Sequence, residues 1–387
     1  MTDIAAIARQ KPVQAALASF TSQLDEIIDL IIQVQQIPAP TFAEGQRAHF
    51  VAQQFATAGL VDVQEDDLHN VYGRFPGTNS HLPPVILSAH TDTVFPQETD
   101  LTIRQENGSI YGPGIGDNST GVAGLITLAK SLWAHGLHPA ADLWFVANVG
   151  EEGMGDLRGM RAVVQRFGSN GRYIVVEGGI FGFVCHQAIG VRRFRLDFQA
   201  PGGHSWGSFG RTSAIHVMSH LIAAIDQIKV PESPRTTYNV GVVQGGQSIN
   251  SIAQSASLWL DLRSEDVIAL QALETQVRQL AADLQVRFPE AAVTFTLVGD
   301  RPAGSIPRDA LLVTWAEAAL RQVGREKIEY FAGSTDTNIP LSQGIPGVCV
   351  GLARSANVHR LDEYLDPSDL PAGLGQLLLL TLAASGM

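Results

Sequence analysis

The sequence predicts an α/β protein in which helices flank a mostly parallel sheet and a smaller α+β domain is inserted. In the first half of the chain, and again near its end, apolar strand-like runs alternate with helical patterns. Alternation of this kind is typical of a parallel sheet with helices on both faces. Between these parts the patterns follow the order β-α-β-β-α-β, which indicates a ferredoxin-like unit. The chain of 387 residues is long enough for two domains with sizeable cores.

The larger domain is predicted from residues 1–189 and 302–387. Its first ~60 residues carry apolar side chains at helical spacing. Short apolar runs bounded by turn residues follow, and each has the length of one buried strand. The predicted helices are residues 24–37, 47–60, 119–136, 157–167 and 309–324, and the predicted strands are residues 83–90, 142–150, 172–179 and 345–353.

The inserted domain is predicted at residues 190–301. A β-α-β-β-α-β unit forms one sheet with both helices on one face, and it leaves an edge strand. Because exposed edges are usually paired or covered, we expect a homodimer that forms through this domain. The predicted strands are residues 191–200, 236–246, 257–264 and 292–300, and the predicted helices are residues 213–228 and 267–288.

Charge and composition argue against several classes of partner. The formal net charge is −12 and no run is rich in Lys or Arg, which argues against nucleic acid and against an anionic membrane surface. No run approaches the ~18 apolar residues of a membrane span, and the N-terminus lacks the apolar stretch of a signal peptide. Cys185 and Cys349 have no metal-type spacing and cannot form a disulfide framework, although a single bond between them stays an alternative. We expect a cytoplasmic protein.

Acidic and imidazole side chains follow several predicted strands directly. Ligands of open parallel sheets bind beyond the carboxyl ends of the strands, so side chains at these ends are expected to meet at one rim. His359 is the least specific of the set, because the chain has eleven histidines. The residues concerned are His90, Asp117, Glu151, Glu152, Glu177 and His359.

Each of these residues alone has a simpler structural explanation. His90, with Asp92 two positions on, could cap a turn, and Asp117 could be the N-cap of the helix that follows. Glu151 and Glu152 could form a solvated acidic turn. However, adjacent carboxylates at a strand end repel unless a cation or a proton lies between them. Independent structural roles would not place the whole set at the same rim, so we favour a joint functional site.

The glycine-rich run YGPGIGDNSTG surrounds Asp117. Its glycines let the backbone bend tightly and approach a ligand. It is not a dinucleotide-binding loop, because it lacks the G-x-G-x-x-G order and carries a carboxylate where a phosphate would need bare amides.

The donor set suits two divalent metal ions. Imidazoles and carboxylates in this number match Zn²⁺, with Mn²⁺ or Co²⁺ as alternatives. Two metals ~3.5–4 Å apart can share one carboxylate and lower the pKa of a bound water toward ~7. A spare carboxylate can then take the proton and pass it to the leaving group.

Taken together, these motifs resemble the M20 family of metallopeptidases and amidohydrolases. The matching segments run in order over nearly the whole chain: SAHTDTV, GPGIGDNSTG, VGEEG, VVEGG, GGHS and VHRLDEYLD. The resemblance implies a zinc-exopeptidase-like catalytic domain with an inserted lid and dimerisation domain. It implies that Glu151 is the general base and acid, and that Asp92 orients His90. It also implies the metal ligands: His90 and Glu177 for one zinc, Glu152 and His359 for the other, and Asp117 as the bridge.

The resemblance implies substrate contacts as well. His204 in GGHS is similar to a histidine that reaches the active site of the partner subunit and polarises the scissile carbonyl. Asn250 is similar to a substrate-binding asparagine, and Gly333 and Ser334 lie where the family commonly touches substrate. His204 and Asn250 could instead be ordinary turn residues.

Arg263 resembles an arginine that clamps a substrate carboxylate, a task that suits its planar guanidinium. The simpler alternative is a strand arginine paired with Asp261 or Glu265.

The predicted function is hydrolysis of an amide or peptide bond in a small substrate, most readily a short peptide, by a metal-activated water with Glu151 as base. An N-acyl- or N-carbamoyl-amino-acid amidohydrolase would use the same site and stays an alternative. The run DNSTG from Asp117 lacks the Lys that many deacylases of the family carry there, which weakens a deacetylase or desuccinylase assignment. A third alternative, a metal-stabilised binding protein, would not need the spare carboxylate of Glu151.

Overall fold

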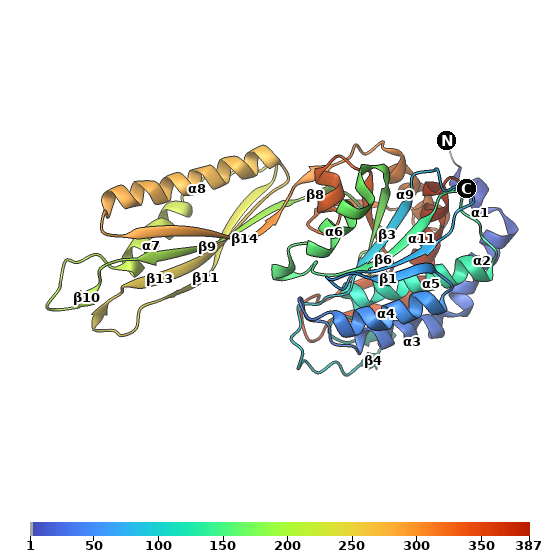
Figure 1. The fold of residues 1–387 in the computed structure, drawn as a ribbon, viewed down its shortest axis with the longest axis horizontal. Helices are drawn as coiled ribbons and strands as arrows, with labels where there is room; N and C mark the ends of the chain where they lie inside the picture. Colours follow the sequence, from blue (N-terminus) through green and yellow to red (C-terminus); the bar gives the residue numbers. More distant parts are fainter. Residues whose placement is uncertain (1–2) are drawn as a thin grey trace. The chain divides into compact units, whose positions relative to one another are not determined.

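The computed structural model describes residues 3–387 and confirms the predicted fold class (Figure 1). The chain divides into two compact units. One, here called the large unit, comprises the chain up to Ala188 and the segment Ser305–Met387. The other, here called the inserted unit, is the segment Ile189–Gly304.

The large unit is built around a mostly parallel sheet (Figure 1). Its four central strands run parallel to one another, and on each side of this group the next strand pairs antiparallel. The strand order is β1 (Val61–Glu65), β2 (Val71–Phe75), β6 (Leu143–Asn148), β3 (Val85–His90), β7 (Arg172–Glu177), β17 (Gly347–Gly351), β8 (Phe183–Ala188) and β15 (Gly304–Ser305), with β16 (Glu329–Gly333) beside β8.

Both faces of this sheet are buried, as is usual for parallel sheets. Along β3, Leu87 belongs to a core shared with most of the helices, whereas its neighbour Ile86 packs on the other face with Met160. Successive side chains of a strand point to opposite faces, so β3 needs apolar residues at nearly every position. The helices are α1 (Ile4–Ala8), α2 (Lys11–Ser22), α3 (Leu24–Gln35), α4 (Gly45–Thr57), α5 (Gly121–Ala134), α6 (Arg158–Phe167), α9 (Leu311–Gln322), α10 (Asn338–Ser342) and α11 (Leu370–Ala384).

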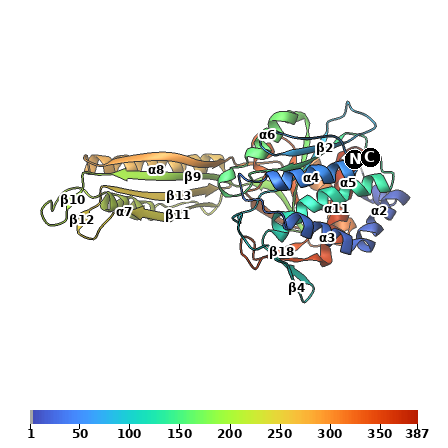
Figure 2. The same cartoon turned by 60° about the horizontal axis from the view of Figure 1, so that its bottom comes forward.

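The inserted unit has the predicted ferredoxin-like arrangement (Figure 2). Its four-stranded sheet is antiparallel, in the order β11-β13-β9-β14, and its two helices contact each other and the same strands. The elements are β9 (Gly190–Gln199), α7 (Ala214–Ile225), β11 (Thr236–Gly245), β13 (Ser255–Ser264), α8 (Val267–Arg287) and β14 (Ala292–Arg301). A two-stranded ribbon, β10 (Gly203–His204) and β12 (Ser251–Ile252), extends from one end of this sheet.

A second small sheet in the large unit is absent from the sequence prediction. It has four strands, each three residues long, which is too short for a hydrophobic period to be recognised. The strands are β4 (Arg104–Glu106), β5 (Ser109–Tyr111), β18 (Arg354–Ala356) and β19 (Tyr364–Asp366). The sheet therefore joins the segment before Asp117 to the two strands that flank His359 in the sequence.

The two cysteines lie next to each other in the main sheet. Cys185 and Cys349 are direct partners across β8 and β17, and both are buried and free.

Among residues 3–387, no helix combines the length and the apolar character needed to cross a lipid bilayer.

Candidate metal centre and active site

Three neighbouring strands bring acidic and imidazole side chains to one rim of the main sheet. β3 ends at His90, which lies opposite Asn148 at the end of β6. Glu151 and Glu152 follow β6 after a short turn. On the other side of β3, β7 ends at Glu177. The parallel register of these strands therefore places their carboxyl ends side by side.

Two groups of three side chains share the carboxylate of Asp117. His90 Nε2 lies 3.0 Å from Asp117 Oδ1 and 3.6 Å from Glu177 Oε2. His359 Nε2 lies 3.1 Å from Asp117 Oδ2 and 3.0 Å from Glu152 Oε1. We call His90, Asp117 and Glu177 the first triad, and His359, Asp117 and Glu152 the second triad. Each oxygen of Asp117 faces a different imidazole, which is the geometry of a bridging ligand.

The donor atoms are spaced as ligands of divalent ions would be. Two ligands about 2.0–2.1 Å from a tetrahedral zinc lie about 3.4 Å apart. The separations between imidazole nitrogens and carboxylate oxygens within the two triads run from 3.0 to 3.6 Å and bracket that value. In addition, one ligand atom each from His90, Asp117 and Glu152 lies within 4.8 Å of the others. The side chains therefore fit two divalent cations with Asp117 between them.

Asp117 owes its position to a kink ahead of α5. Its backbone leaves the helical region (φ −112°, ψ 94°), and the peptide bond to Asn118 is cis. The Asn118 side chain accepts hydrogen bonds from the N–H groups of Gly121 and Gly178 and donates one to the carbonyl of Val176. Asn118 thereby ties the kink to the end of β7, which carries Glu177.

The charges in the site shift one another's protonation. Burial alone would raise the pKa of Asp117, but hydrogen bonds with His359 and His90 hold it well below its usual range. Burial raises the pKa of Glu152 and of Glu177 to about 7, and the charge of Asp117 adds to both shifts. Hydrogen bonds with Asp117 and Glu152 raise the pKa of His359 to about 10. Without metal, the site therefore holds protons near neutral pH.

A metal ion entering the site must displace these protons, because metals bind carboxylates and neutral imidazoles. Since the pKa of His359 is raised to about 10, zinc binding at pH 7 should release at least one proton. Because His359 is protonated below its pKa of about 10, the apparent zinc affinity should fall about tenfold for each unit by which the pH drops below 10, and more steeply below 7, where Glu152 and Glu177 take up protons. Calorimetric titration in two buffers of different ionisation enthalpy measures the release. Binding without proton release would contradict the assignment of His359 as a ligand.

Asp92 fixes the two strand ends relative to each other. Its carboxylate accepts hydrogen bonds from the N–H of Glu151 at 3.0 Å and from the N–H of Glu152 at 2.9 Å. His90 Nδ1 lies 3.0 Å from the main-chain oxygen of Asp92 and 3.6 Å from its carboxylate. Asp92 therefore contacts the His90 imidazole through both its main-chain oxygen and its carboxylate, and the same carboxylate holds the Glu151–Glu152 turn.

Glu151 lies beside both triads without belonging to either. Glu151 is buried, as are His90 and Glu152. After burial itself, the charge of Glu151 makes the largest contribution to raising the pKa of Asp336, and it also raises the pKa values of Glu152 and Glu177. A carboxylate this close to the ligands, and outside both triads, is suited to move a proton.

Asp336 is a buried acid that sequence reasoning missed. It lies in the loop that follows β16 and accepts a hydrogen bond from Asn148 Nδ2 at 2.7 Å. Because Asn148 lies opposite His90, this contact brings the loop to the rim. Of the expected substrate contacts, Gly333 ends β16 and Ser334 begins the same loop. The sequence feature that could have identified Asp336 is an acidic residue in the run AGSTDTN, directly after a strand.

His204 and Asn250 are brought together in the inserted unit. His204 pairs with Ser251 across the β10–β12 ribbon, and the N–H of Ser205 donates to the carbonyl of Asn250 at 3.0 Å. His204 Nδ1 accepts from the N–H of Trp206 at 3.2 Å. A neutral imidazole that accepts at Nδ1 carries its proton on Nε2, so His204 presents a donor, as polarisation of a carbonyl requires.

Arg263 lies at the other end of the same sheet. It pairs with Val191 near the start of β9, whereas the ribbon extends from the end where Ser255 pairs with Gln199. At about 3.3 Å per residue, Arg263 lies about 26 Å along β13 from Ser255. Arg263 Nε donates to Asp261 at 2.6 Å, so the simpler pairing considered for this residue is present. The structure therefore does not bring Arg263 to His204 within one subunit.

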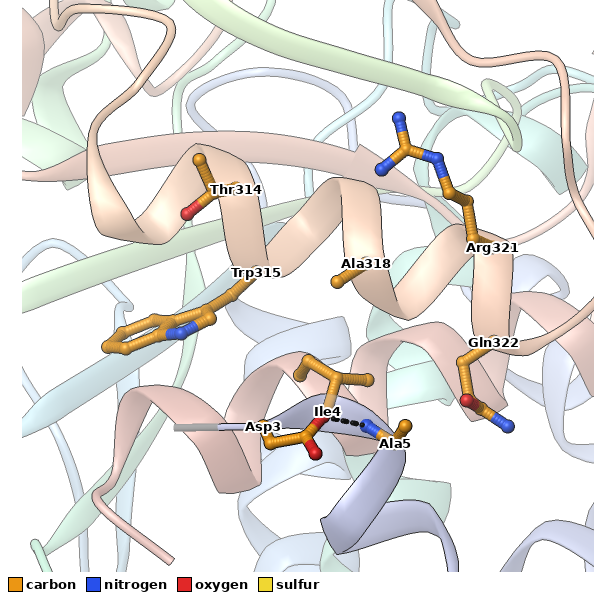
Figure 3. Close-up of a pocket in the computed structure, with 8 residues that line it drawn as sticks. All are labelled: Asp3, Ile4, Ala5, Thr314, Trp315, Ala318, Arg321 and Gln322. Carbon is orange, nitrogen blue, oxygen red and sulfur yellow. Dashed lines mark hydrogen bonds between the residues drawn. The ribbon is translucent and has the colours of Figure 1, made fainter. Parts of the chain in front are cut away.

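A separate surface pocket lies between the start of α1 and α9 (Figure 3). In it the Asp3 carboxylate accepts from the N–H of Ala5 at 2.9 Å and so caps α1. Arg321, across the pocket, pairs with Glu317 on its own helix. None of the candidate site residues lines this pocket, and its polar groups serve the helices that carry them.

The chain has known relatives. A family model described as peptidase family M20/M25/M40 matches residues 86–382. A succinyl-diaminopimelate desuccinylase of Corynebacterium glutamicum is 27% identical over 357 residues, which cover 88% of this chain and 92% of that protein. The solved structure of a tripeptidase from Staphylococcus aureus has a TM-score of 0.82 at 20% identity, covering 94% of this chain and 99% of that one. A hydantoinase/carbamoylase-family amidase from Burkholderia vietnamiensis has a TM-score of 0.72 at 18% identity, covering 94% and 98%.

Proposed function

Because the chain belongs to peptidase family M20/M25/M40, we propose that it is a di-metal hydrolase that cleaves an amide bond in a small substrate. The observation that carries this proposal is the carboxylate of Asp117, whose two oxygens face His90 and His359 separately at 3.0 and 3.1 Å. A single structural ion pair would not need two imidazoles on one carboxylate.

The site residues would have three roles: to hold metal, to move a proton and to stabilise the developing negative charge. The first and second triads would each hold one divalent cation. Bound there, the two cations would supply a nucleophile from water near neutral pH and polarise the scissile carbonyl. Glu151 takes the proton from the attacking water on its carboxylate and delivers it to the leaving nitrogen. His204 Nε2–H donates to the oxygen on which negative charge develops.

Short peptides are the substrate class that we propose first. A tripeptidase shares the fold over nearly the whole chain, and the DNSTG run after Gly116 lacks the lysine of many family deacylases. An N-acyl-amino-acid amidohydrolase is the second candidate, because the similar desuccinylase covers 88% of this chain.

The two candidates are separated by a panel of free dipeptides, free tripeptides and N-acyl or N-carbamoyl amino acids, each assayed with zinc-loaded protein and a chelated control. Chelator-sensitive cleavage of free peptides is the expected outcome. Cleavage of blocked amino acids alone would move the assignment to the amidohydrolase. If no compound were cleaved while two metals were bound, the proposed substrate classes would be wrong.

Zinc is the metal that we propose, with Mn²⁺ and Co²⁺ as alternatives, because two imidazoles and three carboxylates form its ligand set. Elemental analysis of protein purified without added metal tests this choice, and a predominance of another metal would overturn it. We also propose a cytoplasmic location, which suits two free cysteines that face each other across neighbouring strands. Cell fractionation that finds the protein outside the cytoplasm would contradict it.

We propose a homodimer, and the separation of two of the proposed substrate contacts supports it. The end of the sheet from which the His204 ribbon extends lies about 26 Å along β13 from Arg263, so a small substrate touched by both His204 and Arg263 needs residues from two subunits. The long edge strand β11 (Thr236–Gly245), exposed along much of its length, offers a surface for pairing. We therefore propose that His204 acts on the active site of the partner subunit.

A further inference from the structure

The glycine-rich loop before Asp117 surrounds a buried carboxylate from a distant part of the chain. Glu363 has no exposed surface. Its Oε2 accepts from the N–H of Gly114 at 3.0 Å, and its Oε1 accepts from the N–H of Gly116 at 2.8 Å and from the N–H of Asp117 at 2.9 Å. Its main-chain oxygen accepts from the N–H of Gly112 at 2.9 Å. Four amides of one loop therefore converge on a single residue.

This arrangement is an anion nest of the kind that loops use for phosphate, with an internal carboxylate as its occupant. The glycines make it possible. Gly114 has φ +70°, a left-handed conformation that favours glycine. A Cβ on Gly116 would lie 2.5 Å from the side chain of Ser355 and 3.2 Å from Glu363 Oε1. The glycine spacing in YGPGIGD thus serves a protein carboxylate.

Glu363 also links the two parts of the chain that carry the shared ligand and the second imidazole. It lies four residues after His359 and directly before β19, which pairs with β5 just ahead of the glycine loop. Its contact with the N–H of Asp117 spans 246 residues of sequence. Glu363 therefore connects the segment that carries His359 to the backbone of Asp117.

We propose that Glu363 is a positioning residue for the metal centre: its carboxylate holds the Asp117 loop so that the two oxygens of Asp117 can serve both metals. This inference rests on the proposed function. Glu363 is outside both triads. It acts on the metal centre through the hydrogen bond that its carboxylate accepts from the main-chain N–H of Asp117. Groups behind metal ligands typically contribute 10–100-fold to metal affinity, and Glu363 acts on the one ligand common to both ions.

The test compares metal binding by the wild-type chain and Glu363→Gln. The amide oxygen can still accept from the N–H groups of Gly116 and Asp117. Its NH₂ group then faces the N–H of Gly114, which loses its hydrogen-bond acceptor. We expect the dissociation constants of both ions, from calorimetric titration of metal-free protein with Zn²⁺, to rise about 10–100-fold. The visible absorption of the Co²⁺-loaded variant should also differ from that of the wild type, because ligand geometry at both ions changes.

Two further variants keep the result decisive. Glu317→Gln removes a partly buried carboxylate that pairs with Arg321 on α9, away from the ligand loops, and should leave both dissociation constants unchanged. Glu363→Asp keeps the charge but shortens the side chain, and it replaces Glu363→Gln in the comparison if that variant does not fold. Its zinc affinity should also fall.

Unchanged affinities and an unchanged Co²⁺ spectrum in a folded Glu363 variant would overturn the positioning role, even if the wild type binds two ions and is active. Failure of the wild type itself to bind metal would instead overturn the proposed function, so the two outcomes are distinguishable.

Discussion

Glu151→Gln is expected to lower kcat by about 10²–10⁴-fold, the range attributed to general acid–base catalysis, while two metal ions remain bound. The substitution keeps the size of the side chain but removes its ability to accept and return a proton. Metal binding should persist, because Glu151 belongs to neither triad and its main-chain N–H bond to Asp92 is unaffected. Elemental analysis and initial rates on one preparation measure both quantities.

The adjacent residue provides the matched control. Glu152→Gln removes the carboxylate that lies 3.0 Å from His359 Nε2, so this variant should lose affinity for one ion as well as activity. Two neighbouring glutamates would then give opposite results for metal content. If Glu151→Gln kept more than a tenth of the wild-type rate, Glu151 could not be the proton carrier.

Mixing two inactive variants is expected to restore activity if His204 acts across subunits. His204→Ala should lose about 10²–10³-fold in kcat, as does removal of a donor to a developing oxyanion. Glu151→Gln disables the other part of the site. In a mixed dimer, one active site has both intact groups, so random exchange of subunits should recover about a quarter of the wild-type rate.

His216→Ala serves as the control for His204→Ala, because His216 is an exposed histidine on α7 of the same unit. This variant alone should be as active as the wild type. Recovery must be compared with proof of exchange, for example by mass spectrometry of differently tagged chains. No recovery in mixtures that do exchange, or an active monomer in sedimentation, would show that His204 acts within its own subunit or has no role.

The parts of the site that lie at strand ends could be predicted, because regular structure fixes where they point. His90 and Glu177 follow continuous apolar runs, and parallel pairing of β3 and β7 brings such ends to one rim. Similarly, the period change near Gly190 indicated the ferredoxin-like unit, whose order of strands and helices along the chain the structure confirms.

The parts that depend on backbone amides and distant loops could not be predicted. The bond from the Asp117 N–H to Glu363 crosses 246 residues, and neither residue lies in an element with a recognisable period. The loop that carries Asp336 reaches the rim by one hydrogen bond from Asn148, which no local pattern encodes. The pairing of Arg263 with Asp261 is different, because residues two apart on a strand share a face, and the sequence did offer it as an alternative.

The central claim is that two divalent ions share Asp117 and that hydrolysis depends on them. The most direct measurement counts the ions bound per chain, by titrating metal-free protein with Zn²⁺ while following hydrolysis of the best substrate from the panel. We predict two ions per chain, with activity that a chelator abolishes and added Zn²⁺ restores. Fewer than two ions at saturation, or hydrolysis that survives removal of the metal, would contradict it.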